Sequence, residues 1–191
     1  MTASAGSASG ESGTRADDAP AFVVRRLGPA DAVAYRATML DAYEREPAAF
    51  TSTRREREAL PLAWWERRLA AGPDASEVVL GAFERAMPAG VVGLSFEARE
   101  KSHHKATLFG MYVVPHARQR GLGHLLVNAA LDHARSRTGV RIVQLTVSQG
   151  NERARLLYER CGFIAFGVEP FAVAIGSTFL SKIHMWISLA V

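Results

Sequence analysis

The sequence predicts an α+β fold in which helices pack on one central, mostly antiparallel sheet. Three observations favour it. Apolar residues recur at helical spacing in the first third of the chain and again after residue 121, and short apolar runs typical of antiparallel strands fill the middle. With 191 residues the chain is long enough for one sizeable core and short for two. We therefore expect a single domain over residues 21–191.

The first third predicts a strand followed by two helices. Residues 22–27 form a short apolar run, and Pro29 lies where a helix would begin. Pro47 ends that helix and Pro61 begins the next one. The positions at helical spacing are Val33, Ala37 and Leu40, then Leu62, Trp65 and Leu69.

The middle predicts three consecutive strands, at residues 78–83, 91–96 and 107–114, and then a helix that ends at Gly139. The helix has one apolar stripe, formed by Leu122, Leu125, Leu126, Ala129 and His133.

The last third predicts a strand at residues 142–147 and a helix at 151–160 that Gly162 stops. Two strands, near 163–167 and 183–189, complete the chain.

Composition excludes several classes of protein. Residues 1–20 are mostly small and polar, so we expect a disordered N-terminal tail, and they lack the pattern of a secretory signal. No apolar run is long enough to cross a bilayer, and Cys161 is the single cysteine, so we expect a cytoplasmic protein without a membrane partner. The net charge of +4 comes from scattered arginines, which favours solvated helix faces over a nucleic-acid surface.

The loop at residues 118–123, Arg-Gln-Arg-Gly-Leu-Gly, joins a strand directly to a helix. Helix N-termini favour anions, glycines allow a ligand to approach the backbone, and Arg118 and Arg120 add positive charge. Pyrophosphate fits this arrangement. The loop lacks the Gly-Lys-Ser/Thr of a Walker loop and the third glycine of the dinucleotide fingerprint. The alternative is a tight turn with solvent-exposed arginines.

The segment from Val147 to Phe163 provides a second signal. In a helix that starts near residue 151, Asn151, Ala154 and Tyr158 share one face. A polar, a small and a phenolic side chain in a row suit a face along which a thin ligand lies. The alternative is that Tyr158 only packs in the core.

Together the two segments resemble the GNAT superfamily of N-acetyltransferases, which use acetyl-CoA. The resemblance rests on the Arg-x-x-Gly-x-Gly pattern at 118–123, on the strand end at 112–115, and on Asn151, Tyr158 and Gly162-Phe163. It is strong from about residue 91 to 167. It implies a three-layer α/β/α fold with a mixed sheet that splays between its fourth and fifth strands.

The resemblance also implies site residues. The backbone of Met111, Tyr112 and Val113 would pair with the pantetheine arm, and Asn151 and Ala154 would line that arm. Tyr158 would protonate the departing thiolate after direct attack by a neutral amine. The pyrophosphate would be held by the loop and the start of the helix, at Arg118, Gln119, Arg120, Gly121, Leu122, Gly123 and His124.

One departure from the family concerns the general base. Many relatives have a glutamate on the fourth strand, where this chain has Thr107, which cannot act as a base. Glu97 is a substitute candidate, acting directly or through water; the alternative is a solvated acid at a strand end.

The pair His103-His104 and the thiol of Cys161 are two further reactive groups, and a structural role is favoured for both. His103-His104 lies in an expected hairpin turn without a third ligand in view, so no metal is expected. Cys161 could carry an acyl group, but a packed apolar side chain is favoured because no partner histidine is identifiable.

The sequence leaves the acceptor open: a metabolite, an aminoglycoside-like antibiotic, a peptide terminus or a protein lysine. The family's acceptor site would correspond to residues 43–65 and 171–182, and Asp41, Glu44 and Glu46 could attract a cationic amine. The favoured function is acetyl-CoA-dependent N-acetylation of a primary amine; a non-catalytic acyl-CoA-binding module and a nucleic-acid-binding domain are the alternatives. A homodimer is an open expectation.

Overall fold

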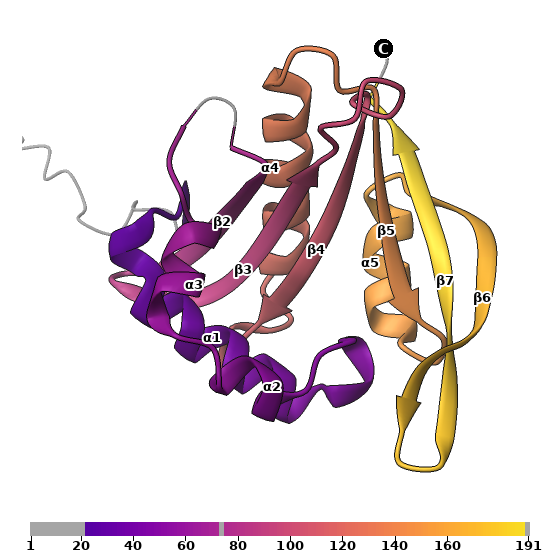
Figure 1. The fold of residues 1–191 in the computed structure, drawn as a ribbon, viewed down its shortest axis with the longest axis horizontal. Coiled ribbons are helices and arrows are strands. Elements are labelled where there is room, and N and C mark those ends of the chain that lie inside the picture. The colour runs from indigo at the N-terminus through magenta and orange to yellow at the C-terminus, as the bar shows by residue number, and fades with distance from the viewer. Residues whose placement is uncertain (1–21, 73–74, 190–191) are drawn as a thin grey trace, which may run out of the picture.

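The computed structural model describes residues 22–72 and 75–189, so the expected tail at 1–20 lies outside the described residues. Within that range seven strands form one sheet in the order β1-β2-β3-β4-β5-β7-β6 (Figure 1). Strands β4 and β5 are parallel, and every other neighbouring pair is antiparallel. The predicted α+β fold with a mixed, mostly antiparallel sheet is confirmed.

The strands follow the predicted order along the chain. They are β1 (Val23–Arg26), β2 (Glu77–Glu84), β3 (Met87–Phe96), β4 (Lys105–Val113), β5 (Ile142–Ser148), β6 (Ile164–Ile175) and β7 (Thr178–Ser188).

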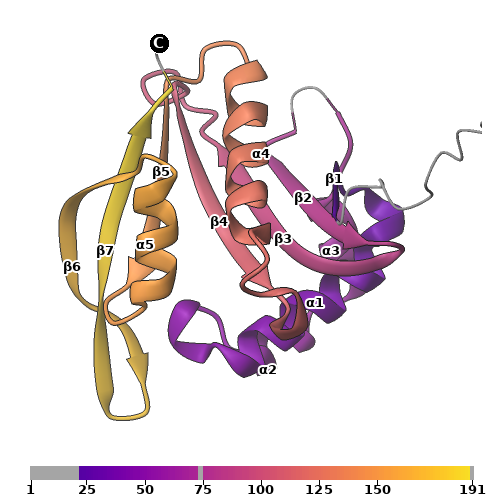
Figure 2. The same cartoon turned by 180° about the vertical axis from the view of Figure 1, so that it is seen from behind.

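Helices cover both faces of the sheet. On one face lie α1 (Ala32–Arg45), α2 (Arg54–Glu58) and α3 (Leu62–Arg68); on the other lie α4 (Leu122–Ser136) and α5 (Glu152–Arg160) (Figures 1 and 2). Short 3-10 turns stand at η1 (Pro29–Asp31), η2 (Pro47–Ala49) and η3 (Pro115–Ala117). In the described part of the chain, no helix is long and apolar enough to cross a membrane.

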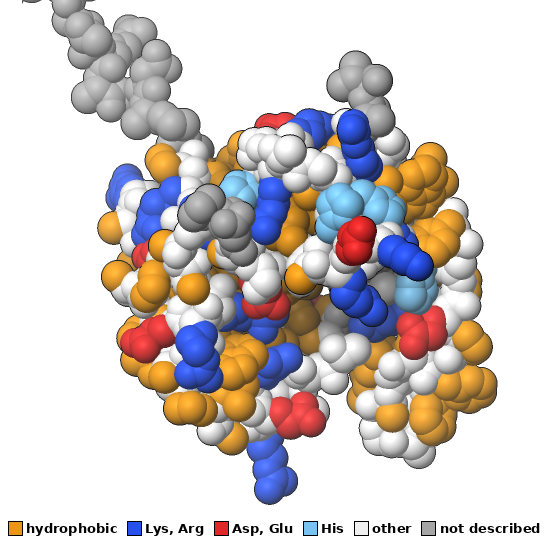
Figure 3. Space-filling view, turned by 45° about the horizontal axis from the view of Figure 1, so that its top comes forward, with side chains coloured by type: hydrophobic (Ala, Val, Ile, Leu, Met, Phe, Trp, Pro, Cys, Tyr) orange, Lys and Arg blue, Asp and Glu red, His pale blue; other side chains and the backbone are white. Residues whose placement is uncertain are grey.

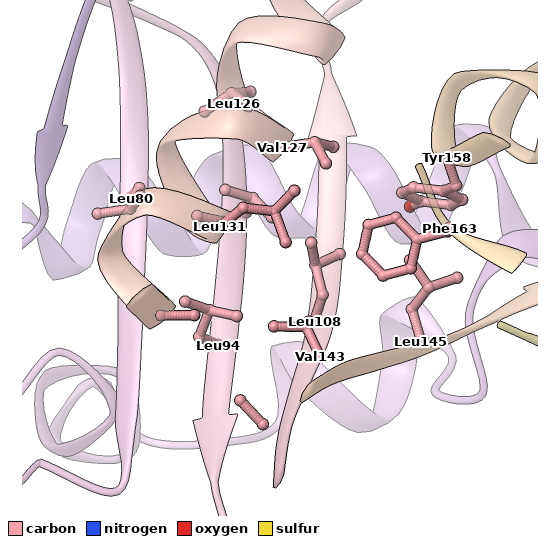
Figure 4. Packing of buried hydrophobic residues seen from close by; sticks show 14 of the residues in the cluster. Leu80, Leu94, Leu108, Leu126, Val127, Leu131, Val143, Leu145, Tyr158 and Phe163 are labelled. Atoms are coloured by element: carbon pink, nitrogen blue, oxygen red, sulfur yellow. The ribbon is translucent and has the colours of Figure 1, made fainter. Parts of the chain in front are cut away.

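Each face of the sheet has its own apolar core. On the α4 side, Leu126, Val127 and Leu131 of α4 pack on residues of the sheet such as Leu94 of β3 and Leu108 of β4 (Figure 4). On the α1 side, the buried Trp65 packs edge-on against Tyr35 of α1, in a cluster that includes Val79 and Val91 of the sheet. Leu125, expected on the buried stripe of α4, is 42% exposed, so that prediction was wrong. It is a neighbour of Leu126 and is turned outward by the 100° step between helical residues.

The sheet opens between β4 and β5. The two strands pair only from Lys105 to Thr107 with Ile142 to Gln144. Beyond Thr107 they diverge, and no strand in the described part of the chain pairs with that edge of β4 (Figure 1). In the pairing of β3 with β4, Val91 lies opposite Tyr112 and Gly93 lies opposite Phe109. Two β4 residues therefore face one β3 residue, and β4 bulges at Gly110, whose φ is +60°. The splay implied by the resemblance is present.

The C-terminal hairpin is longer than predicted. We expected strands near 163–167 and 183–189, whereas β6 and β7 extend to Ile175 and from Thr178. Gly167, Pro170 and Gly176 broke the apolar pattern in the sequence. An irregularity in register between Glu169 and Val173, with Phe171 at φ +55°, accommodates the interruption within one strand. The hairpin projects beyond the rest of the sheet (Figure 1).

Candidate active site

A cavity of about 260 Å³ lies where β4 and β5 diverge. Its lining includes residues of α5 on one face of the sheet and residues 49–51, at the end of η2 and just beyond it, on the other face. The cavity therefore passes through the plane of the sheet. Figure 3 shows the molecule hollowed between its helical part and the β6–β7 hairpin, with Lys and Arg side chains at the rim. The lining residues are Ala49, Phe50, Thr51, Thr107, Leu108, Phe109, Gly110, Met111, Thr146, Val147, Ser148, Asn151, Ala154, Leu157, Tyr158 and Lys182.

The three β4 positions implied by the resemblance differ in their surroundings. Met111 lines the cavity. Tyr112 turns its side chain into the α1 core, where its hydroxyl donates a hydrogen bond to Asp41 Oδ2 at 2.7 Å. The carbonyl of Val113 accepts a hydrogen bond from Nε of Arg118 at 2.9 Å. Of the β4 residues at the bulge, Gly110 and Met111 therefore line the cavity, whereas Tyr112 and Val113 are engaged elsewhere.

The loop before α4 has two residues in the left-handed region, Gln119 at φ +63° and Gly121 at φ +76°. Such residues turn neighbouring amides toward one side and can form an anion-binding concavity. A Cβ added at Gly121 would meet no atom within 4 Å, so glycine is required there for its backbone conformation and not for space within the chain.

The N-terminus of α4 presents free backbone donors. Its N-cap, Gly121, provides no side-chain cap, and the amide of Leu125 bonds to the carbonyl of Gly121 at 3.1 Å. The amides of Leu122, Gly123 and His124 therefore point out of the helix end. The side chain of Leu122 is buried in the core, and the ring of His124 bonds to Asn128. These residues can therefore contribute backbone groups to an anion site.

Gly123 allows α4 to approach α5. A Cβ at this position would lie 3.0 Å from Cδ2 of Leu157 and 3.5 Å from Cε of Met111. Leu157 and Met111 both line the cavity. The absence of a side chain at Gly123 therefore leaves room for these two residues to pack against α4.

Both loop arginines have carboxylate partners that the sequence reasoning missed. Arg118 forms an ion pair with Glu46 at 2.9 Å, and Arg120 forms one with Glu84 at 2.6 Å. Because these pairs join residues far apart in the sequence, no local pattern signals them. The arginines tie the loop to α1 and β2, and the carboxylates offset part of their positive charge.

Helix α5 brings Asn151, Ala154 and Tyr158 to the cavity, as their spacing predicts. The side chain of Asn151 also caps the helix, because its Oδ1 accepts a hydrogen bond from the amide of Ala154 at 3.2 Å. One residue therefore both starts the helix and lines the cavity.

The hydroxyl of Tyr158 has no hydrogen-bond partner among the described residues, although the side chain is only 6% exposed. Its ring packs edge-on against Phe163 (Figure 4). Burial raises the pKa of Tyr158 above its usual value. The phenol therefore keeps its proton at neutral pH, at the wall of the cavity, with its oxygen available to a ligand.

Glu97 does not lie with these residues. It follows β3 at the closed end of the splay and bonds to Arg99 at 2.8 Å, outside the cavity lining. The hydrogen bond from Arg99 lowers the pKa of Glu97. Thr107 does line the cavity, and no described lining residue is Asp or Glu.

His103 and His104 pack against each other in the turn before β4. Among the residues described, no group of three or more His, Cys, Asp or Glu could hold a metal ion. Cys161 is half-buried and outside the cavity lining, and burial raises the pKa of its thiol.

The α1 acids considered for the acceptor are already paired. Asp41 bonds to Arg45 and Tyr112, Glu44 contacts Arg54 at 3.5 Å, and Glu46 contacts Arg118. None lines the cavity. Lys182 is the last residue of the range 171–182 that the resemblance assigned to the acceptor site, and in the structure it lines the cavity. The alternation of polar and apolar residues in Lys182-Ile183-His184 indicates that Lys182 and His184 share one face of a strand, and this was the sequence signal for the position of Lys182.

A mixed sheet that splays between its parallel strands, with a helix N-terminus beside the splay, is the fold of the GNAT acetyltransferases, and comparison with known proteins identifies the family. The model of the acetyltransferase (GNAT) family matches residues 37–163. The chain belongs to this family.

Sequence relatives match over shorter stretches. An uncharacterized N-acetyltransferase of Bacillus subtilis, YhfO, is 42% identical over 28% of this chain and 35% of its own length. The spermidine N(1)-acetyltransferase of Vibrio cholerae is 32% identical over 37% of this chain and 42% of its own length. The chain thus spans less than half the length of these curated relatives.

Solved structures match nearly the whole fold. A GNAT-family acetyltransferase from Streptococcus pneumoniae superposes with a TM-score of 0.79 at 24% identity, over 87% of this chain and 99% of that one. A Salmonella typhimurium protein solved with its cofactor acetyl-CoA has a TM-score of 0.73 at 22% identity, over 89% and 95%. These likenesses show the fold.

Proposed function

We propose that the protein is an acetyl-CoA-dependent N-acetyltransferase that acts on a primary amine by direct attack. The observation that carries the proposal is a cavity lined both by β4, at its edge facing the splay, and by Tyr158 on α5. Through this cavity an acyl donor would enter from one face of the sheet and an amine from the other, and the two would meet between β4 and β5.

The residues present fit acetyl-CoA. The edge of β4 at Gly110 and Met111 has backbone groups without a strand partner, and the amides at the start of α4 suit a pyrophosphate. Asn151 and Ala154 would line the pantetheine arm. When bound, acetyl-CoA supplies an acetyl thioester, the acyl donor for the amine.

The chain's own groups then have separate roles. Backbone amides of β4 near the bulge would stabilise negative charge that develops on the carbonyl oxygen. Tyr158 would donate its proton to the sulfur as the C–S bond breaks and the C–N bond forms. No carboxylate lies among the described lining residues, so we propose that the amine attacks as the neutral base. The proton that its nitrogen loses on forming the amide would pass through water and restore the phenol of Tyr158.

A non-catalytic acyl-CoA-binding module is the second candidate, favoured by the lack of a carboxylate in that lining. The experiment that separates the two is a panel of primary amines assayed for free thiol release with acetyl-CoA, beside calorimetry of CoA binding. Turnover of any amine eliminates the binding module. CoA binding without turnover of any amine would overturn the proposed activity. Spermidine belongs in the panel because one relative is named for it.

A further inference from the structure

Lys182 on β7 is the one charged residue among the described residues that line the cavity. In register it lies opposite Ser148, whose hydroxyl reaches Ala48 on the α1–α2 face of the sheet. Directly opposed residues of an antiparallel pair point to the same face. Lys182 therefore lies on the α1–α2 side of the cavity, away from Tyr158 and α5.

The ammonium of Lys182 has no hydrogen bond or ion pair with any described residue. Glu169 is its neighbour in register on β6, but the carboxylate of Glu169 contacts His184 at 3.0 Å. Burial lowers the pKa of Lys182, and the charge of Glu169 offsets part of that effect. Glu169 thus acts on Lys182 only through its charge, and the ammonium keeps hydrogen-bond donors for an anionic ligand in the cavity.

Other charges near this mouth do not supply that partner. Asp41, Glu44 and Glu46 are each paired with an arginine. Arg57, on the same side, bonds to Ser52 and stacks on Trp64. On this side of the cavity Lys182 is thus the one charged group in the described lining, and the acids Asp41, Glu44 and Glu46 are engaged elsewhere.

We propose that the acceptor is a primary amine that carries a carboxylate, and that Lys182 binds this carboxylate. This inference rests on the proposed function, since it describes the acceptor of that reaction. Lys182 then determines specificity: it orients the amine toward the thioester and disfavours polycationic acceptors.

The test uses amines matched in length that differ only in the far group: 5-aminopentanoate, pentylamine and 1,5-diaminopentane, with α-amino acids and their amides as a second series. We expect kcat/KM to be about 10- to 100-fold higher for the carboxylate member, the range of one charge-assisted hydrogen bond. Lys182→Met should abolish this preference, so that the ratio of kcat/KM for 5-aminopentanoate to that for pentylamine falls to about 1. Lys182→Arg should retain the preference, and Lys182→Glu should shift it to the diamine.

Lys101→Met, on an exposed lysine, is the matched control and should change nothing. Two outcomes would overturn the inference: no preference for the carboxylate in the unaltered protein, or an equal loss for all amines in Lys182→Met, which would place Lys182 on the acyl donor. Calorimetry of 5-aminopentanoate binding to the CoA-saturated protein tests the same point without turnover. Binding that Lys182→Met removes supports it even if acetylation fails, and absence of binding contradicts it.

Discussion

The hydroxyl of Ser148, at the end of β5, donates a hydrogen bond to the carbonyl of Ala48, and the two oxygens lie 2.5 Å apart. Ser148 is 3% exposed. This contact joins the segment after α1 to β5, the far strand of the splay, on the α1–α2 side of the cavity.

Replacing Ser148 by Ala should lower the free energy of unfolding by about 1 kcal/mol, since a buried hydrogen bond is lost and the exposed Ala48 carbonyl turns to water. Urea denaturation measures the change. Ser136→Ala is the control, because the Ser136 hydroxyl makes an exposed local bond to the carbonyl of His133. The control should stay within about 0.5 kcal/mol of the unaltered protein. Equal stability of the two variants would mean that the Ser148 contact does not hold the segment.

Most of the fold could be predicted because its signals are local. Helical and alternating spacing located the elements, and the loop at 118–123 stood out by its own residues. Helix spacing also placed Asn151, Ala154 and Tyr158 on one face, and all three line the cavity.

The remainder depends on contacts between distant segments. The partners of Arg118 and Arg120 come from α1 and β2, and Lys182 reaches the cavity through the register of β7 against β5. Register is fixed by the assembled sheet, so one sequence without its structure does not define it. The extension of β6 past Gly167 was missed for a different reason, because Gly167, Pro170 and Gly176 interrupt the local apolar pattern there.

Gly121→Asp should weaken acetyl-CoA binding by on the order of tenfold to a hundredfold, because it adds a negative charge where the phosphates are proposed to lie. Gly121→Asn is the matched control: it has nearly the same shape, and asparagine tolerates the left-handed conformation that φ +76° requires. Calorimetry on both folded variants separates charge from backbone strain. Equal affinities for the two variants would remove the loop from the phosphate site.

The stability of the protein should fall in alkali, and Tyr112 should contribute to the fall. Burial, with the hydrogen bond and charge of Asp41, raises the pKa of Tyr112 to about 12. In the unfolded chain the phenol ionises near about pH 10. The stabilisation due to the protonated phenol is therefore complete below pH 10 and is lost as the pH rises toward 12.

Tyr112→Phe removes both the hydrogen bond to Asp41 and this pH dependence. Below about pH 10 we expect the variant to be less stable by a constant amount, on the order of 1.5–3 kcal/mol for a bond to a charged acceptor. That difference should shrink between pH 10 and 12. Urea unfolding at a series of pH values measures it. A difference that stays constant to pH 12 would contradict the raised pKa.

The last prediction concerns Tyr158, whose phenol oxygen is unpartnered within the described chain at the wall of the cavity. Burial raises the pKa of Tyr158, so the phenol keeps its proton across the working pH range. The same desolvation disfavours a free thiolate beside it, so a proton donor is most useful there.

Tyr158→Phe retains the ring that packs on Phe163 and deletes only the O–H, so the fold and the affinity for CoA should change little. Turnover should fall by roughly 10²- to 10⁴-fold, the usual range for a lost general acid. If Tyr158 only packs in the core, turnover should survive with at most a small change in stability. The measurement uses one productive amine under conditions in which the chemical step limits the rate. A loss of less than about threefold, under ~1 kcal/mol of barrier, would reject the acid role.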